Sequence, residues 1–212
     1  MDKKLRVGLR TWIEIDKKAI KNNYDQFRGL IPKACKLCAV VKSNAYGHGL
    51  VDFSKEVSKL GVDFLAVDSV VEARTLQEEE VKTPILVLGY TLPEMILVAS
   101  QKNISLTISH FEGLKSLLKN LGDHKIKIHI KIDSGMHRQG FFEKDIKKVI
   151  DFLKKNSEKI EVEGLYTHFA AAKNPAFPER TKKQIVVFKK WVEAFKSAGL
   201  KPIIHASATS GS

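Results

Sequence analysis

Short apolar runs alternate along this chain with longer segments whose apolar residues recur every three or four positions. The recurring segments, such as 145–155 and 180–198, predict amphipathic helices. Several short runs are apolar on both faces, which is typical of parallel strands covered by helices. The alternation therefore predicts an α/β fold with right-handed crossovers. The short runs are KLCAVVK (36–42), DFLAVD (63–68), PILVLGY (84–90), SLTIS (105–109), KIKIHIKID (125–133), IEVEGLYTHF (160–169) and IIHASAT (203–209).

The strand count points to a (β/α)8-type TIM barrel that is incomplete. We count seven barrel strands, whereas a closed barrel of this type has eight. The segment TWIEID (11–16) also has the pattern of a strand, but the helical stretch 17–29 separates it from the others. An open doubly wound sheet is the alternative fold, although no glycine-rich phosphate turn follows the first strand.

Composition places the chain among globular proteins. It has 212 residues, of which 43% are hydrophobic and 28% charged, and this length fits a single barrel domain. No apolar run approaches the roughly 20 residues of a membrane span, and no apolar stretch follows the basic start, so we expect neither membrane nor secretory targeting. Two cysteines exclude a disulfide scaffold and favour a reducing, cytoplasmic location.

The net charge of +12 comes largely from lysine. The lysines form doublets spread from Lys3 to Lys190, mostly in segments with a helical pattern. A nucleic-acid site usually gathers basic residues on one face or segment, so this scatter favours a solvated surface, with an anionic partner as the alternative. We expect no nucleic-acid partner.

Lys42 is the first candidate for chemistry because catalytic groups of parallel α/β folds lie at the carboxyl ends of strands. It ends the apolar run Val40–Lys42 and precedes SNAYGHG (43–49). An amine among apolar neighbours favours its neutral form, which attacks carbonyl groups. The alternative is a lysine whose ammonium reaches solvent from the strand end. The glycine-flanked Tyr-Gly-His-Gly turn favours a ligand site.

The run 125–133 places isoleucines on one face and His129, Lys131 and Asp133 on the other. In a central parallel strand that polar face must meet other polar groups, most simply in a site. The run leads into a turn that carries Arg138, whose guanidinium could bind a carboxylate or phosphate through two hydrogen bonds. A solvent-exposed arginine is the alternative interpretation.

Histidine and cysteine spacing gives no metal signature. His168 ends the sixth strand and His205 lies in the seventh, but no H-x-x-x-H pair appears, so we expect no metal. Cys35 and Cys38 have CxxC spacing, yet a strand would send them to opposite faces and no second CxxC follows. We interpret them as small buried or loop residues.

The stretch VVKSNAYGHG (40–49) resembles the cofactor-lysine motif of bacterial alanine racemases, which are pyridoxal-phosphate enzymes built from a barrel and a second β domain. Six further segments match this family in the same order along about 200 residues, which makes the resemblance specific. They are TWIEID (11–16), FLAVDSVVEAR (64–74), PILVLG (84–89), KIDSGMHRQG (131–140), EGLYTHFA (163–170) and IHASATSG (204–211).

The resemblance implies roles for individual residues. Lys42 would bind pyridoxal 5'-phosphate covalently and act as one of two catalytic bases. Tyr46 would donate its hydroxyl to the cofactor phosphate, and His168 would pack against the pyridine ring. Arg138 would hydrogen-bond the ring oxygen of the cofactor and approach the substrate carboxylate. Thr209 would offer a hydroxyl to the phosphate.

The sequence departs from the family at several positions. The family's seventh-strand histidine, here His205, usually precedes an Asn-Ser pair, where this chain has Ala208 and Thr209. Lys173 replaces an aspartate of the entrance loop, and Lys131 lies where some members carry a carbamylated lysine.

The family also implies groups that these 212 residues do not contain. Racemisation needs a base on each face of a planar carbanion, and the family's second base is a tyrosine in the β domain of the partner subunit. We therefore expect residues 1–212 to be a single N-terminal cofactor-binding domain of a protein whose full-length form is a homodimer, with the C-terminal β domain absent.

Three functions stay open at this point. The chain is the cofactor domain of an alanine racemase that interconverts L- and D-alanine for peptidoglycan synthesis, a racemase or decarboxylase for another amino acid, or a non-catalytic barrel that binds the cofactor or a partner. The activity of residues 1–212 alone is an open question for the first two.

Overall fold

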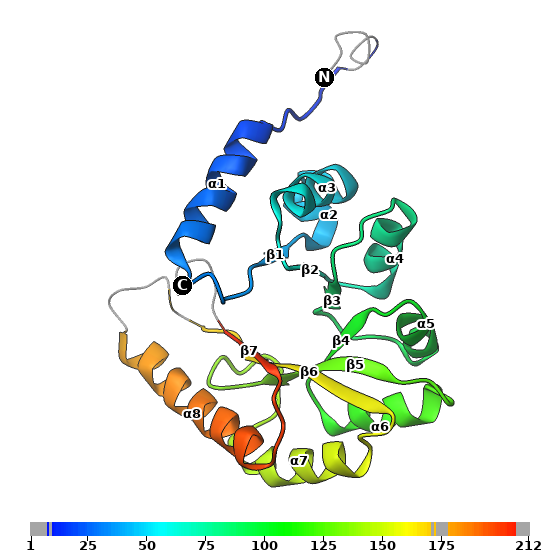
Figure 1. Cartoon of the computed structure of the whole chain (residues 1–212), viewed down its shortest axis with the longest axis vertical. Helices are drawn as coiled ribbons and strands as arrows, with labels where there is room; N and C mark the ends of the chain where they lie inside the picture. The colour runs from blue at the N-terminus through cyan, green and yellow to red at the C-terminus, as the bar shows by residue number, and fades with distance from the viewer. Residues whose placement is uncertain (1–7, 9, 171, 173–177, 207–212) are drawn as a thin grey trace. The chain divides into compact units, whose positions relative to one another are not determined.

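A computed structural model describes residues 8, 10–170, 172 and 178–206 of the chain. Strands and helices alternate as predicted, and the strands follow one another in the sheet in chain order, β1 to β7 (Figure 1). The strands are β1 (Cys38–Val40), β2 (Phe64–Val67), β3 (Ile85–Val87), β4 (Ser105–Ile108), β5 (Ile126–Ile132), β6 (Ile160–Thr167) and β7 (Ile203–His205). The predicted α/β class with seven barrel strands is confirmed.

The helices are α1 (Lys17–Leu30), α2 (Lys42–Tyr46), α3 (Leu50–Leu60), α4 (Val70–Glu78), α5 (Ile96–Gln101), α6 (Phe111–Asn120), α7 (Ile146–Lys155) and α8 (Pro178–Ser197). The three helices whose ranges were predicted, α1, α7 and α8, lie close to their predicted positions, and the others lie between the strands. Two short 3₁₀ turns, η2 (Pro93–Met95) and η3 (Glu143–Asp145), precede α5 and α7. None of the helices in the described part of the chain has the length and apolar character that crossing a membrane would need.

The chain forms two compact units, which we describe separately. The first comprises Met1–Val67 and Val71–Ile85, and the second comprises Asp68–Val70 and Leu86–Ser212. In the first unit, β1 pairs with β2 in parallel, with Cys38 opposite Phe64. Helix α1 begins after Asp16, whose carboxylate accepts a hydrogen bond from the backbone N–H of Lys18 at 2.8 Å and so caps the helix.

The segment 11–16 does not form the predicted strand among the described residues. These residues form no ladder with any described strand, and they lead directly into the cap of α1. Trp12 and Ile13 are 47% and 69% exposed. A strand exists only when its backbone groups pair with a neighbour, so apolar alternation alone does not produce one.

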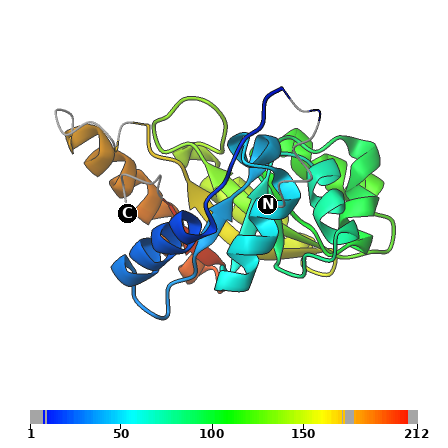
Figure 2. The same ribbon diagram turned by 90° about the horizontal axis from the view of Figure 1, so that it is seen from above.

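In the second unit, β4, β5, β6 and β7 pair in parallel. Figure 2 shows β5 and β6, green and yellow, running side by side, as their long register requires. Helices α5 to α8 pack against these strands and one another. The aromatic centre of this packing is Trp191, with Phe195 on the same helix and Phe141 before η3, all fully buried. Their rings lie 5.9 and 6.5 Å from that of Trp191.

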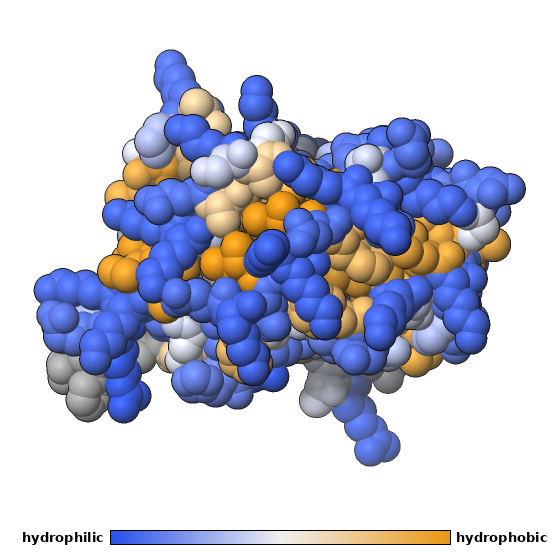
Figure 3. Space-filling view, turned by 90° about the horizontal axis from the view of Figure 1, so that it is seen from below, coloured by the Kyte–Doolittle hydropathy of each residue, from blue (hydrophilic) through white to orange (hydrophobic). Residues whose placement is uncertain are grey.

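The charged residues lie mostly outside this core. Figure 3 shows hydrophilic side chains over much of one face, with apolar side chains between them. Several lysines, such as Lys17, Lys59 and Lys182, are about 70% exposed and pair with glutamates. Such exposed pairs contribute little to stability because solvent screens them.

Candidate active site

Lys42 is separated from β1 by one residue and lies at the carboxyl end of the strand, where the sequence predicts it. Fully buried Val41 joins it to the sheet through a 2.8 Å hydrogen bond from its N–H to the carbonyl of Ala66. The backbone then enters an unusual turn, because φ is positive at four successive residues other than glycine, Ser43 to Tyr46. A left-handed conformation costs roughly 1–2 kcal/mol for each L-residue.

Hydrogen bonds hold this left-handed turn in place. Glu72 accepts the N–H of Ser43 at 2.7 Å from a position 29 residues further along the chain. The carbonyl of Asn44 accepts the N–H groups of Gly47 and Gly49, both at 3.0 Å. The side chain of Asn44 accepts the N–H of Leu50 at 2.8 Å and so caps α3. Backbone strain that the surroundings hold in this way is typical of functional sites.

The turn brings two of the predicted site residues together in the first unit. Lys42 begins the turn and Tyr46 ends it. Lys42 is half-buried, whereas Tyr46 is 62% exposed. The sequence predicts a tight turn here from its glycines, but the left-handed residues precede Gly47. No glycine in the sequence marks those four positions.

In the second unit, Asp133 organises the loop that carries Arg138. Its Oδ1 accepts the backbone N–H groups of Gly135, Met136 and His137 at 2.9, 2.9 and 3.0 Å. Its Oδ2 accepts the N–H of Arg138 at 3.1 Å. Burial raises the pKa of the Asp133 carboxyl, but the hydrogen bonds from these amides lower it by more. The pKa therefore lies below its ordinary value.

His168 follows β6, and its backbone is tied to α8. Gln184, which is 3% exposed, donates to the carbonyl of His168 at 3.4 Å and accepts the N–H of Ala170 at 3.0 Å. Gln184 also donates to Ser134 at 3.3 Å. The loops that carry Arg138 and His168 follow paired strands and share this one amide.

The polar face of β5 is buried, as the sequence predicts. His129, Lys131 and Asp133 are 2%, 5% and 6% exposed. His129 Nδ1 lies 2.8 Å from His205 Nε2, and His129 Nε2 lies 3.1 Å from Glu163 Oε2. This face therefore meets polar groups of neighbouring strands, and its place in a site stays a prediction.

Charge and burial set the ionisation of this cluster. Burial raises the pKa of Glu163, but hydrogen bonds from His129 and Ser105 outweigh it and leave the pKa below its ordinary value. Burial, with a smaller contribution from the charge of His129, lowers the pKa of His205 to about 3. At neutral pH, Glu163 is therefore a carboxylate and His205 a neutral imidazole.

Tyr166 connects this cluster to its neighbours. Its ring stacks on that of His205, with centroids 4.6 Å apart and planes 9° apart. Its hydroxyl lies 3.1 Å from the hydroxyl of Thr107, and the ammonium of Lys131 lies 5.6 Å from its ring centre. The sequence did not single out Glu163, Tyr166 or Thr107. The glycine after Glu163 is the one local signal, since glycine within a strand suggests a bulge.

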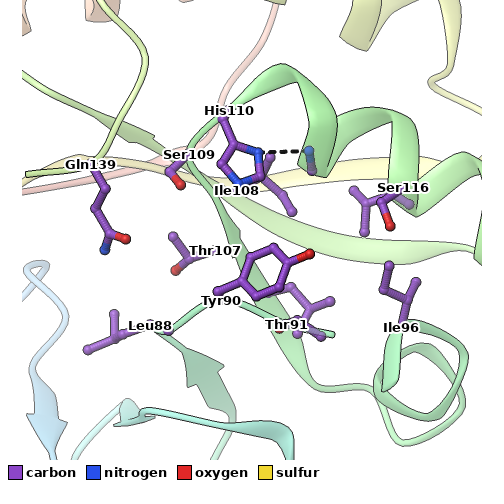
Figure 4. A pocket seen from close by; sticks show the side chains of 14 residues that line it. Leu88, Tyr90, Thr91, Ile96, Thr107, Ile108, Ser109, His110, Ser116 and Gln139 are labelled. Atoms are coloured by element: carbon purple, nitrogen blue, oxygen red, sulfur yellow. Dashed lines mark hydrogen bonds between the residues drawn. The ribbon is translucent and has the colours of Figure 1, made fainter. Parts of the chain in front are cut away.

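A small pocket lies at the carboxyl ends of β3 and β4 (Figure 4). Tyr90 and His110 form two sides of it, with ring centres 6.0 Å apart, and Gln139, next to Arg138 in sequence, reaches it from the loop after β5. The Nδ1 atom of His110 accepts the N–H of Gly113 at 2.8 Å, so this histidine caps α6. The pocket adds apolar and hydroxyl-bearing walls beside the Arg138 loop.

The remaining predicted residues stand as follows. Thr209, with Ala208 and Lys173, lies outside the described residues. Cys35 and Cys38 form no disulfide; Cys38 is exposed as a residue, but burial raises the pKa of its thiol to about 12. Within the described ranges, no three histidine, cysteine or acidic side chains gather to hold a metal ion.

Comparison with known proteins matches most of the chain to one family. The model of the family "Alanine racemase, N-terminal domain" covers residues 15–212. An alanine racemase of Methanococcus maripaludis is 41% identical over 202 residues, which are 92% of this chain and 53% of that protein. An alanine racemase of Geobacillus stearothermophilus is 39% identical over 165 residues, with 76% of this chain and 42% of that protein covered.

Solved structures agree. An alanine racemase of Clostridium difficile 630 superposes with a TM-score of 0.88 and 34% identity over 96% of this chain and 54% of that one. An alanine racemase of Bacillus anthracis, solved with bound L-Ala-P, superposes with a TM-score of 0.86 and 35% identity. The match covers 94% of this chain and 52% of that one. The chain thus spans about half the length of these relatives. With the strand–helix alternation and the Lys42 motif in place, the chain belongs to the family of alanine racemase N-terminal domains.

Proposed function

We propose that this chain is the cofactor-binding domain of a pyridoxal-phosphate-dependent alanine racemase, with Lys42 as the residue that binds the cofactor. The observation that carries the proposal is the position of Lys42, an amine at the carboxyl end of β1 on a strained left-handed turn that also carries Tyr46. Family membership supports the same assignment.

The chemistry of the donor set fits pyridoxal phosphate. Lys42 supplies an amine that condenses with an aldehyde, and Tyr46 supplies a hydroxyl donor for a phosphate. Arg138 supplies a fork of N–H donors for an oxyanion or carboxylate, and His168 supplies a flat ring. When bound, the cofactor acts as an electron sink for a carbanion at the amino-acid α-carbon.

Within this scheme each residue has a defined task. The free amine of Lys42 would move a proton to or from the α-carbon on one face of the substrate. Arg138 orients the carboxylate of alanine, and Asp133 keeps the Arg138 loop in a fixed conformation. Thr209 contributes a hydroxyl to the phosphate. We propose that the base for the opposite face, a tyrosine, comes from a second domain of a partner subunit in a homodimer.

The cofactor assignment is tested by adding pyridoxal phosphate and recording the absorbance band of the lysine-bound form. We expect a band in the wild-type chain and loss of the band in Lys42→Ala. The control variant is Lys33→Ala, which replaces an exposed lysine before β1 and should keep the band. A band that persists in Lys42→Ala would refute the assignment of Lys42.

The reaction is tested on a form of the protein that includes the second domain. We expect the enzyme to form D-alanine from L-alanine without release of carbon dioxide. Carbon dioxide release would instead identify a decarboxylase, and turnover of another amino acid alone would identify a different racemase. Cofactor binding without turnover would support a non-catalytic binding domain.

A further inference from the structure

An irregularity in the sheet brings Glu163 into contact with His129. Ile128 of β5 lies opposite Val162 of β6, but His129 lies opposite Gly164, so Glu163 is an extra residue between two registered pairs. Such a β-bulge re-aims a side chain and is frequent beside active sites. Here it directs the carboxylate of Glu163 to the buried polar face of β5, where it is 16% exposed.

Gly164 has no side chain, and the ring of His129 occupies the space where one would lie. A Cβ atom at position 164 would lie 2.1 Å from Nδ1 of His129, so only glycine is compatible with the ring in this position. His129 is 2% exposed. The bulge and the glycine together hold the imidazole between Glu163 on one side and His205 on the other.

The partners of Glu163 fix the hydrogen on His129. Glu163 is ionised and therefore accepts hydrogen bonds only. The hydroxyl of Ser105 donates to Oε2, and His129 Nε2 lies 3.1 Å from the same oxygen. His129 must therefore carry a hydrogen on Nε2. Neutral His129 then has a lone pair on Nδ1, which accepts a hydrogen bond.

The next link fixes the hydrogen on His205. His129 Nδ1 lies 2.8 Å from His205 Nε2, so neutral His129 requires a hydrogen on Nε2 of His205. His205 is itself neutral, so its Nδ1 then has a lone pair. The stacked ring of Tyr166 restrains the imidazole from one face. The tautomer of His205 thus follows from the protonation state of its neighbour.

We propose that Glu163 and His129 form a positioning relay that determines which ring nitrogen of His205 carries its hydrogen. While His129 is neutral, Nδ1 of His205 is an acceptor. When His129 takes up a proton on Nδ1, His205 must accept with Nε2, its hydrogen moves to Nδ1 by exchange with water, and Nδ1 becomes a donor. The relay does not rest on the proposed function, because it is argued from contacts among β4, β5, β6 and β7 alone.

The charged and titratable groups around His129 lie on β5, β6 and β7. Lys127 on β5 lies 3.8 Å from Glu163, and Lys131 on the same strand lies over Tyr166 of β6. His205 faces His129 from β7, with ring centres 5.0 Å apart. Within this cluster, the proton that switches the relay is the one that His129 takes up on Nδ1.

The experiment is ¹⁵N NMR of the histidine ring nitrogens in the 212-residue chain without cofactor, with signals assigned from His129→Gln and His205→Gln. While His129 is neutral, we expect both histidines to carry hydrogen on Nε2. On acidification, we expect protonation of His129 to coincide with the appearance of a hydrogen on His205 Nδ1. A hydrogen on Nδ1 of either neutral ring, or titration of His129 that leaves His205 unchanged, would overturn the relay.

Three variants isolate the role of Glu163. Glu163→Leu removes the acceptor, and we expect both tautomers of His129 and of His205 to appear. Glu163→Gln keeps an amide oxygen that accepts, so we expect it to restore the Nε2 hydrogen. Ser105→Ala removes the other donor and should leave both tautomers unchanged. Unchanged tautomers in Glu163→Leu would contradict the proposal, and if that variant does not fold, the wild-type acidification series decides. Neither readout depends on Lys42 or on cofactor binding.

Discussion

The carboxylate of Asp133, at the end of β5, holds the Arg138 loop by accepting its backbone N–H groups. Replacing this residue gives the most quantitative test of the structure. Asp133→Ala removes the acceptor of four backbone N–H groups, those of residues 135 to 138. After the loop, Phe141 pairs with the backbone of residues at the end of β5. Its N–H donates to the carbonyl of Lys131 at 2.9 Å, and its carbonyl accepts the N–H of Asp133 at 3.0 Å. Loss of the carboxylate therefore leaves the loop anchored only at its ends.

The expected loss of stability follows from these contacts. Hydrogen bonds to a charged group contribute about 1.5–3 kcal/mol each, but water replaces much of this where the donors reach solvent. Gly135, His137 and Arg138 are exposed residues, whereas the Asp133 side chain is buried. We therefore expect a loss of about 3 kcal/mol, which is on the order of a hundredfold in the folding equilibrium. Asp133→Asn keeps one accepting oxygen and should lose about half as much.

The assay is urea denaturation of each variant, together with hydrogen exchange of amides 135–138. Asp16→Ala is the control, because it removes a single exposed helix cap and should lose only about 1 kcal/mol. We expect Asp133→Ala to speed exchange across the Arg138 loop and to leave α1 unchanged, and Asp16→Ala to do the reverse. If Asp133→Ala lost no more stability than Asp16→Ala, the carboxylate would not organise the loop.

Three further outcomes follow from the structure. Gly164→Ala places a methyl group 2.1 Å from His129 Nδ1 and should destabilise the protein by about 3 kcal/mol in urea denaturation; a neutral result would contradict the packing. Asn44→Ala removes the cap of α3 and should lower stability by about 1 kcal/mol, with faster exchange at the start of that helix. The pKa values of Asp133 and Glu163 are lowered in the fold, so their stabilisation is complete above the ordinary carboxyl pKa and is lost as pH falls through the lowered values. Acid titration of unfolding in Glu163→Gln should show a shallower loss than in the wild type.

Much of the fold could be predicted from the sequence because hydrophobic periodicity depends on local spacing. Helix α7 begins one residue from its predicted start, and β5 lies within its predicted run. The polar face of β5 could also be predicted, since alternation along a strand fixes which side chains share a face. The segment 11–16 does not form the predicted strand because its strand-like pattern has no described strand to pair with.

The geometry of the candidate site depended on contacts between distant segments. The left-handed turn after Lys42 places serine, alanine and tyrosine, together with one asparagine, at positive φ, and all of these except asparagine disfavour it. Glu72 helps to hold it from another helix. The inward position of Glu163 depends on the register between β5 and β6, which no pattern within either strand determines. The position of Lys42 at a strand end, by contrast, could be predicted because it is a local feature.

The central claim is that Lys42, among the 30 lysines of this chain, binds pyridoxal phosphate. The most direct measurement is to add the cofactor, reduce the complex with borohydride so that the link to lysine becomes permanent, and map the label by mass spectrometry of peptides. We predict that the label lies on the peptide that contains Lys42. A label distributed over surface lysines, or concentrated on a different one, would contradict the account.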